Sequence, residues 1–249
     1  MSLGNYLFYE EPRITLYCGD CRDVLPLLNE PIDLLLTDPP YASGARRDAD
    51  RQVRGSMLRE TDDEDWFSHD AMTTWGFSWF LRSVLTDLRG HLNPGAHLYV
   101  FTDWRQAPNV YGMLEATGYR VNHCLTWDKE YYWRGSYWRN QHENIVFASL
   151  GMPKAMLNQG MGSVLRCRGV RPEAREHPTE KPIALLRQII RAVPGDAVLD
   201  TFCGSASTLE AAKREGRRAI GIEIEPRYCE IAVKRLRQEV LPLVAHDPL

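Results

Sequence analysis

A short apolar run at residues 32–37 constrains the fold of this chain more than any other feature. The run (IDLLLT) is mostly apolar and does not alternate with polar residues, which is the pattern of a strand covered on both faces. It ends at residues 38–41 (DPPY), where two prolines prevent a strand or a helix from continuing. Strands of this kind belong to sheets with helices on both sides, so the run predicts an α/β protein.

The rest of the chain alternates strand and helix signals in the same manner. Further strands are expected at residues 14–17, 96–102, 119–127, 143–149, 197–200 and 219–223. Helices are expected at residues 20–28, 77–88 and 182–193. Three more are expected, one that ends at Gly118, one that begins at about Thr208 and one that begins at Pro226. One Rossmann-like, doubly wound and mostly parallel sheet accounts for these elements, so residues 1–249 are expected to form a single domain. Variable loops are expected at about 42–68 and 129–176.

Composition and charge exclude several classes of protein. With 249 residues, of which 44% are hydrophobic, the chain has enough apolar material for a folded core. Thirty lysines and arginines against 33 aspartates and glutamates give a net charge of −3, so a nucleic-acid partner requires a local basic surface. No stretch approaches the roughly 18 apolar residues of a membrane helix, and the N-terminus lacks a secretory signal pattern. The six cysteines lack metal-ligand spacing, so we expect reduced thiols, no metal and a cytoplasmic protein.

The segment that follows the predicted strand at 197–200 has the character of a ligand-binding loop. Residues 200–208 (DTFCGSAST) join this strand to a helix through small side chains, which let backbone N–H groups approach a ligand at the sheet edge. About 20 residues further on, the next strand ends at Glu223, whose carboxylate can accept hydrogen bonds from ribose hydroxyls. The alternative is a tight turn with Glu223 as a solvated strand end, since no full glycine fingerprint is present.

The DPPY segment places a carboxylate, two prolines and an aromatic ring at the end of a buried strand. Asp38 and the Pro39 carbonyl can accept hydrogen bonds from the two N–H groups of an exocyclic amine, while Tyr41 stacks on the ring that carries this amine. Pro40 adds rigidity and, like Pro39, has no N–H donor. The segment therefore favours a site for a planar amine, and the alternative is a diproline loop with a surface tyrosine.

These motifs resemble those of the S-adenosylmethionine-dependent DNA amino-methyltransferases, which methylate adenine N6 or cytosine N4. Residues 38–41 match the catalytic motif of this family and residues 200–208 its cofactor loop, although the family usually has Pro at Thr201, Gly at Ala206 and Thr at Ser207. Three further motifs match at residues 19–21, 141–143 and 177–182 (HPTEKP). The catalytic motif precedes the cofactor loop, as in the family's β arrangement, so the resemblance implies a circularly permuted methyltransferase fold over nearly the whole chain.

The resemblance also implies a role for each matching residue. The catalytic residues would be Asp38, Pro39, Pro40 and Tyr41. The methionine end of S-adenosylmethionine would be held by Asp200, Phe202, Cys203, Gly204 and Ser205, and its carboxylate by Thr179 and Lys181. Glu223 would bind the ribose hydroxyls of the cofactor, and Asp20 its adenine amine. Considered alone, Lys181 fits a solvated residue at a helix start, and Asp20 fits a helix cap.

The chemistry that this resemblance implies is methyl transfer to a base flipped out of the DNA duplex. In cytosine-N4 enzymes of this family Ser more often replaces the first Asp of the catalytic motif, so Asp38 favours adenine N6, with cytosine N4 as the alternative. An RNA methyltransferase is a more remote alternative, because such families usually carry Asn at this position and the unpermuted order. A nicotinamide oxidoreductase would leave residues 38–41 unexplained.

Contact with DNA is expected from two basic segments. Residues 129–175 contain eight lysines and arginines against three acidic residues, a local charge of +5, with interleaved tyrosines and tryptophans that suit phosphate contact and base stacking. Residues 44–59 form a second, arginine-rich segment. The candidate DNA-binding residues are Arg46, Arg47, Arg134, Trp138, Arg139 and Arg168, and the alternative is an aromatic cluster that packs a long loop. The resemblance also allows a homodimer and a cognate restriction endonuclease as partners, and no membrane partner is expected.

Overall fold

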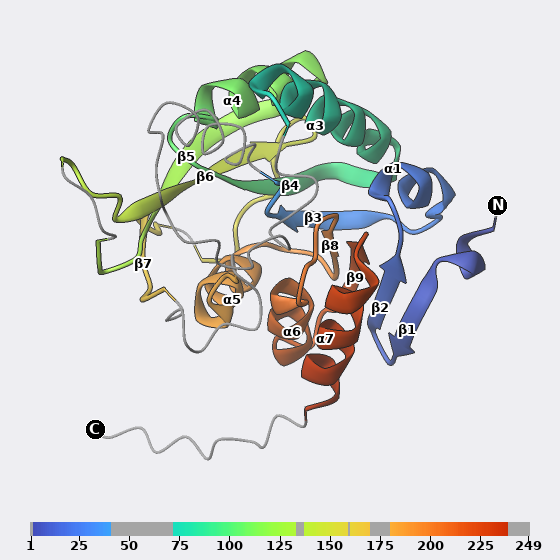
Figure 1. The fold of residues 1–249 in the computed structure, drawn as a ribbon. Coiled ribbons are helices and arrows are strands. Elements are labelled where there is room, and N and C mark those ends of the chain that lie inside the picture. The colour runs from blue at the N-terminus through green and yellow to red at the C-terminus, as the bar shows by residue number, and fades with distance from the viewer. Residues whose placement is uncertain (1, 41–71, 133–136, 159, 170–179, 239–249) are drawn as a thin grey trace, which may run out of the picture.

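One mixed sheet organises the chain. The computed structural model describes residues 2–40, 72–132, 137–158, 160–169 and 180–238. Within these residues nine strands form one sheet in the order β1-β2-β9-β8-β3-β4-β6-β5-β7 (Figure 1). The strands are β1 (Leu7–Glu11), β2 (Ile14–Cys18), β3 (Ile32–Thr37), β4 (Leu92–Thr102), β5 (Arg120–Asp128), β6 (His142–Ser149), β7 (Val164–Arg166), β8 (Ala197–Asp200) and β9 (Arg218–Glu223). The α-helices are α1 (Cys21–Val24), α3 (Thr74–Leu88), α4 (Ala107–Ala116), α5 (Ile183–Ala192), α6 (Ser207–Arg214) and α7 (Pro226–Arg237).

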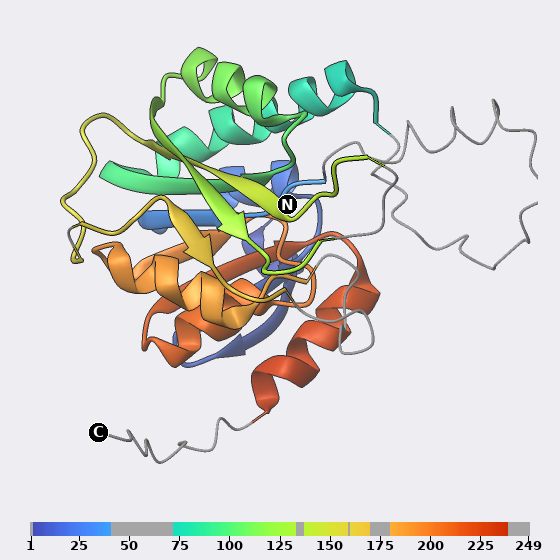
Figure 2. The same cartoon turned by 90° about the vertical axis from the view of Figure 1, so that its left-hand side faces the viewer.

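The sheet is mostly parallel and is covered on both faces. Strands β2, β9, β8, β3 and β4 run in one direction, whereas β1 is antiparallel to β2, and β6 is antiparallel to both β4 and β5. Helices α1, α3 and α4 cover one face, and α5, α6 and α7 cover the other (Figures 1 and 2). The predicted α/β class and doubly wound sheet are therefore confirmed. Among the described residues, no helix has the length and apolar character needed to cross a membrane.

The structure differs from the sequence-based expectations at two edge strands and one helix. The sequence pattern does not predict β1, which is largely exposed, or β7, which has three residues within a segment expected to be a loop. Strand β1 has only three apolar residues, Leu7, Phe8 and Tyr9, before two glutamates, and β7 has two, so neither has the longer run of a central strand. The helix expected through Leu28 is α-helical only to Val24 and continues as a 3₁₀ turn, Leu25–Leu27, where Pro26 lacks the N–H that an α-helix requires.

The central strand β3 is buried on both faces, which explains its unbroken apolar run. Leu35 packs in the cluster that contains residues of α1, α3 and α4, whereas Leu34 and Leu36 pack in the cluster formed with α5, α6 and α7. All three leucine side chains are at most 1% exposed. Burial of a leucine side chain contributes about 1.5–3 kcal/mol, so β3 stabilises both layers at once.

The chain changes direction across the sheet between β3 and β8. From β3 it continues to β4 on one side, and from β8 it continues to β9 on the other, while β3 and β8 pair with each other. In an open α/β sheet, ligands bind beyond the carboxyl ends of the strands at such a switch point. Because β3 ends at Thr37 and β8 at Asp200, the DPPY segment and the predicted cofactor loop both begin there.

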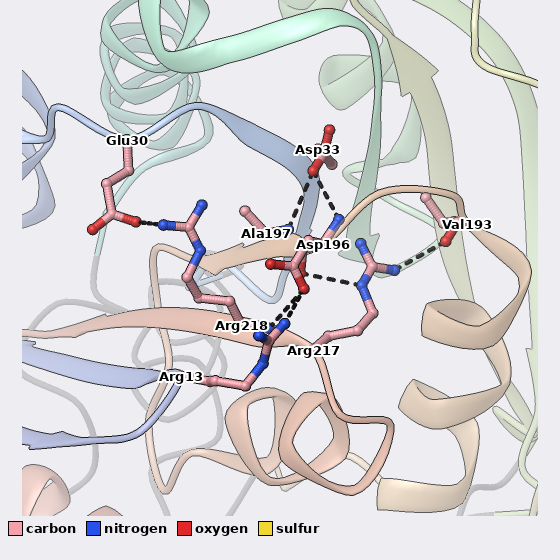
Figure 3. Close-up of polar contacts among 8 residues, drawn as sticks. All are labelled: Arg13, Glu30, Asp33, Val193, Asp196, Ala197, Arg217 and Arg218. Atoms are coloured by element: carbon pink, nitrogen blue, oxygen red, sulfur yellow. Dashed lines mark hydrogen bonds and ion pairs between the residues drawn. The ribbon is translucent and has the colours of Figure 1, made fainter.

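A polar cluster joins the loops at the opposite, amino-terminal ends of β3, β8 and β9 (Figure 3). Asp33 accepts hydrogen bonds from the backbone N–H groups of Asp196 (2.9 Å) and Ala197 (3.2 Å). It also accepts hydrogen bonds from the Asn93 amide (2.8 Å) and the Lys154 ammonium (3.0 Å). Burial pushes the pKa of Asp33 up, but these donors outweigh burial and hold the pKa well below its ordinary value.

Arginine side chains complete this cluster. The Arg13 guanidinium pairs with Asp196, and the Arg218 guanidinium pairs with Glu30. Arg217 Nη1 donates a hydrogen bond to the backbone oxygen of Val193 at 3.0 Å (Figure 3). These contacts connect loops that are distant in sequence, at the sheet edge opposite to Asp38, so we interpret the cluster as structural.

Asp33→Asn is expected to lower the free energy of unfolding at pH 7 by about 2 kcal/mol, because the charge that accepts these hydrogen bonds is lost. The pKa of Asp33 is lower in the folded than in the unfolded protein, so its contribution is present above about pH 4 and is lost as the pH falls further. Urea denaturation should therefore show a smaller difference in the free energy of unfolding between variant and wild type at pH 3 than at pH 7. Glu115→Gln, on an exposed position of α4, is the control and should change stability by less than about 0.5 kcal/mol. An equal difference in the free energy of unfolding at both pH values would contradict the low pKa assigned to Asp33.

Candidate active site

Five carboxylates gather where strands meet one edge of the sheet. Asp20 follows β2, Glu223 ends β9, Asp200 ends β8 and Asp38 follows β3. Glu143 is the second residue of β6, which is antiparallel to β4 and therefore starts at this same edge. The order of these strands in the sheet brings together residues that are up to two hundred positions apart in sequence. This edge holds both the predicted catalytic segment and the predicted cofactor loop.

Asp200 is the most buried of these carboxylates, with 3% exposure. Its Oδ1 accepts hydrogen bonds from the Thr37 hydroxyl at 2.8 Å and from the Phe202 backbone N–H at 3.1 Å. Burial raises the pKa of Asp200 to about 6, against the effect of these donors. A rigid, buried carboxylate at the switch point suits a ligand group that carries positive charge or N–H donors.

The loop after β8 departs from the usual family motif at three positions, Thr201, Ala206 and Ser207. The Thr201 hydroxyl lies 3.1 Å from the Thr37 hydroxyl, a contact that proline cannot make. Ala206 is fully buried and left-handed, with φ 65° and ψ 32°, a conformation that costs a residue other than glycine about 1–2 kcal/mol. The Ser207 hydroxyl accepts a hydrogen bond from Arg235 at 2.6 Å. The position where the family has glycine is thus the one that turns the chain into α6.

Glu223 connects the end of β9 to this loop. Its Oε2 accepts a hydrogen bond from the Gly204 backbone N–H, and its Oε1 accepts one from the Glu225 backbone N–H, both at 2.8 Å. Burial raises the pKa of Glu223, and these two hydrogen bonds oppose the rise. Because each carboxylate oxygen has a second lone pair, Glu223 can hold the loop and still accept hydrogen bonds from ligand hydroxyls.

Asp38 and Lys181 form an ion pair on the other side of the switch point. The Lys181 side chain, just before α5, is 7% exposed, and the Asp38 side chain is 18% exposed. Lys181 Nζ donates to Asp38 Oδ2 and lies 3.5 Å from Glu143 Oε2. It also lies 5.2 Å from the centre of the Phe101 ring. The alternative interpretation of Lys181 as a solvated residue at a helix start is therefore wrong.

Asp20 caps α1, as predicted, by accepting a hydrogen bond from the Arg22 backbone N–H at 2.9 Å. The same carboxylate pairs with the Arg22 guanidinium, whose Nε lies 3.0 Å from Asp20 Oδ1. The Arg22 guanidinium stacks 5.4 Å from the centre of the Phe80 ring, and Phe80 packs against Phe202 at 5.6 Å. Asp20 thus belongs to the same local cluster as Phe202 of the predicted cofactor loop. Arg22 and Phe80 lie outside the sequence motifs and were not predicted.

The remaining predicted site residues divide by their position. Tyr41, Thr179, Arg46, Arg47 and Arg134 lie outside the described residues. Pro39 is buried and Pro40 is half-buried, directly after Asp38, whereas Cys203 and Ser205 are buried in the loop after β8. Trp138, Arg139 and Arg168 are exposed.

The exposed aromatic and basic residues lie beyond the carboxyl end of β5. The Lys129 backbone N–H donates to the Gln141 carbonyl at 2.9 Å, which anchors the segment that contains Trp138 and Arg139. The Cys167 backbone N–H donates to the Asp128 carbonyl at 3.1 Å and anchors the segment that contains Arg168. Both segments therefore join the sheet at the edge that holds the candidate site.

Two further residues of this site, besides Arg22 and Phe80, had no predicted role. Thr37 directly precedes Asp38, and its hydroxyl donates to Asp200. The sequence signal for this role was a hydroxyl side chain at the end of an otherwise apolar strand. Glu143 was part of a matching motif, and the signal for its role was a charged residue at the start of a largely apolar strand. Their partners, Asp200 and Lys181, are distant in sequence, so the contacts themselves could not be predicted.

Comparison with known proteins identifies the family of the chain. The model of the N6/N4 methyltransferase family, described as DNA methylase, matches residues 32–234. The chain belongs to this DNA methylase family. The methylase YubD of Escherichia coli (strain K12) is 31% identical to it over 221 residues, which cover 88% of each chain. The matched range runs from the start of β3 into α7 and contains Asp38, Lys181, Asp200 and Glu223.

Two solved structures share the fold of this DNA methylase. M1.HpyAVI in complex with S-adenosylmethionine aligns with a TM-score of 0.67 and 23% identity, over 90% of this chain and 99% of its own. The cytosine-N4-specific PvuII DNA methyltransferase aligns with a TM-score of 0.70 and 16% identity, over 92% of this chain and 88% of its own. These likenesses establish the methyltransferase fold of the DNA methylase, and the target base has to be argued from the site.

Proposed function

We propose that this DNA methylase transfers the methyl group of S-adenosylmethionine to the exocyclic N6 of adenine in DNA. The observation that carries the proposal is the position of the Asp38 carboxylate, at the switch point and one strand away from Asp200. An acceptor carboxylate followed by a proline carbonyl suits the two N–H groups of an exocyclic amine. A base held there lies next to the loop proposed to bind the cofactor.

The residues present fit S-adenosylmethionine as the cofactor. Asp200 and Glu223 are buried acceptors at neighbouring strand ends, which suit the amino group and the ribose hydroxyls. Lys181 is a buried ammonium that suits a carboxylate. We assign the methionine end to Asp200 and the loop Phe202–Ser205, the carboxylate to Lys181 and Thr179, and the adenine amine to Asp20. When bound, the cofactor supplies a sulfonium methyl group, whose carbon–sulfur bond breaks as the bond to the target nitrogen forms.

Asp38 and Pro39 have the central roles in the proposed reaction. The lone pair of the exocyclic nitrogen is delocalised into the ring, which makes this nitrogen a poor nucleophile. Hydrogen bonds from its two N–H groups to Asp38 and to the Pro39 carbonyl favour a pyramidal nitrogen with an available lone pair. The nitrogen becomes positively charged before it loses a proton, so the Asp38 carboxylate stabilises the transition state more than the ground state. Tyr41 is proposed to stack on the flipped base.

Adenine is proposed over cytosine because of Asp38. Within the resemblance described above, cytosine-N4 enzymes more often have Ser at this position, whereas this chain has the Asp-Pro-Pro-Tyr form. Cytosine N4 requires the same planar-amine chemistry, so it is the outcome that the assay below has to distinguish.

DNA contact is proposed for the exposed segments beyond β5. Trp138 is fully exposed, and the Arg139 guanidinium lies 4.9 Å from the centre of the Tyr132 ring. Exposed rings and guanidinium groups next to the site suit base stacking and phosphate contact by Trp138, Arg139 and Arg168. The roles of Arg46, Arg47 and Arg134, and the partnerships with a second copy and with a restriction endonuclease, stay predictions.

The test is an assay of methyl transfer from labelled S-adenosylmethionine to unmethylated genomic DNA, with total RNA in parallel. Nucleoside mass spectrometry of the digest is expected to show N6-methyladenine in the DNA and no label in the RNA. N4-methylcytosine in the DNA would overturn the assignment of the base while retaining the site. Label confined to RNA would overturn the proposed substrate.

A further inference from the structure

Four charged side chains alternate in sign from the catalytic segment toward the end of β5. They are Asp38, Lys181, Glu143 and Lys129. Lys181 donates to Asp38, and its Nζ lies 3.5 Å from Glu143 Oε2, while Glu143 Oε1 accepts a hydrogen bond from Lys129 Nζ at 2.6 Å. The catalytic carboxylate is therefore connected to a second carboxylate through one buried ammonium.

Glu143 Oε2 is the unusual atom of this cluster. It is buried and makes no hydrogen bond among the described residues. Burial pushes the pKa of Glu143 up, but the charges of Lys181 and Lys129 outweigh burial and hold it below its ordinary value. Burial pushes the pKa of Lys181 down, but Asp38 and Glu143 raise it above its ordinary value. A buried, charged oxygen is costly unless a cation compensates it, and the Lys181 ammonium at 3.5 Å is that cation.

We propose that Glu143 is a positioning residue that holds the Lys181 ammonium beside Asp38 and receives it when Asp38 binds the target amine. This inference rests on the proposed function. In the proposed arrangement one N–H group of the base donates to Asp38, and Lys181 donates to Oδ2 of the same carboxylate. Until the proposed cofactor carboxylate pairs with it, an ammonium displaced from Asp38 without a second acceptor in the protein would be a buried, unpaired charge, which is costly. Glu143 Oε2, at 3.5 Å, provides that acceptor without a large movement of the lysine.

The surroundings of Lys181 limit the groups that influence its titration. Asp38 and Glu143 face its ammonium directly, and the Phe101 ring lies 5.2 Å from it. Lys129 acts through Glu143, and its ammonium lies 5.1 Å from the centre of the Trp127 ring. Asp200 lies close enough to Asp38 for the two charges to interact. Among these groups Glu143 is the carboxylate that can be neutralised without removing a proposed contact to substrate or cofactor.

The experiment compares Glu143→Gln with the wild type by two measurements. The first is reductive methylation of Lys181 by formaldehyde and borohydride in the protein without cofactor, quantified by peptide mass spectrometry between pH 7 and 10. Loss of the Glu143 charge should lower the pKa of Lys181 and increase its labelling about tenfold at pH 8, with the labelling of Lys213 unchanged. The second is turnover on genomic DNA, which should fall at least about tenfold while the affinity for S-adenosylmethionine changes less than about threefold.

Two further variants separate this role from a loss of folding. Glu215 also bridges two cations, Arg187 at 2.5 Å and Arg191 at 2.7 Å, but it lies at the end of α6. Glu215→Gln should leave both measurements unchanged. Lys129→Met removes a positive charge from Glu143, so the labelling of Lys181 should decrease, opposite to the effect of Glu143→Gln. General loosening of the structure would increase labelling in both variants.

The outcomes are distinct. Unchanged labelling of Lys181 in Glu143→Gln, or increased labelling in both Glu143→Gln and Lys129→Met, would overturn the inferred coupling. Wild-type turnover in Glu143→Gln would overturn the positioning role. Absence of any methylated DNA with the wild-type protein would instead overturn the proposed function and, with it, the catalytic part of this inference, while the labelling ratio would still decide the coupling of Lys181 to Glu143.

Discussion

Asp38→Ala is expected to lower methyl transfer to genomic DNA by about 10³-fold or more, while the affinity for S-adenosylmethionine changes less than about threefold. In the proposed mechanism the carboxylate faces the nitrogen that gains positive charge, so its loss should raise the energy of the transition state more than that of the bound substrates. Cofactor affinity should persist because Asp200 and Glu223, on β8 and β9, lie on the other side of the switch point. Product formation measured by mass spectrometry and cofactor binding measured by calorimetry test the two statements separately.

Two variants control for this result. Asp38→Asn keeps the shape of the side chain but removes its charge, and it should be almost as inactive as Asp38→Ala. Asp103 follows the neighbouring strand β4 and accepts hydrogen bonds from the N–H groups of Arg105 (2.9 Å) and Gln106 (2.8 Å) in the turn before α4. Asp103→Asn should retain turnover, because the carbonyl oxygen of an Asn side chain can accept the same hydrogen bonds. A fully active Asp38→Ala protein would disprove the proposed mechanism.

Glu223→Ala is expected to weaken the binding of S-adenosylmethionine by about 10- to 100-fold, because hydrogen bonds to a charged group contribute about 1.5–3 kcal/mol. The substitution removes the proposed acceptor for the ribose hydroxyls. It also removes the acceptor for the Gly204 backbone N–H, which lies in the loop after β8. Turnover at saturating cofactor should recover to near the wild-type value, because Glu223 does not contact Asp38 or the base in the proposed arrangement. Titration calorimetry and a turnover curve against cofactor concentration measure both effects.

The neighbouring residue Glu225 supplies the control for this prediction. It has the same charge, lies two residues further along the chain, and contributes its backbone N–H rather than its side chain to Glu223. Glu225→Gln should therefore leave the affinity for the cofactor within about threefold of wild type. Unchanged affinity in Glu223→Ala would remove the ribose role of Glu223.

Local sequence patterns predict the central strands well and the edges poorly. Strands β3 and β8 begin and end at the predicted residues, because a strand buried on both faces needs an unbroken apolar run that polar residues terminate. The edge strand β1 is missed because its three apolar residues are followed at once by Glu10 and Glu11, so its run is shorter than that of a central strand. The short strand β7 has only a three-residue pairing with β5 and gives equally little signal.

The sequence by itself determined the α/β class and the positions of Asp38, Asp200 and Glu223 at strand ends, and the family resemblance implied the circularly permuted order of motifs. The first two properties follow from short-range patterns, in which apolar runs, prolines and small residues act within a few positions. Only the tertiary structure decided which of these groups touch one another. The pairing of Lys181 with Asp38 and Glu143 depends on strand order, because β3, β6 and the start of α5 meet only when the sheet is assembled. Charges that are solvated in the separate segments become buried partners there, and burial is what gives these contacts their strength.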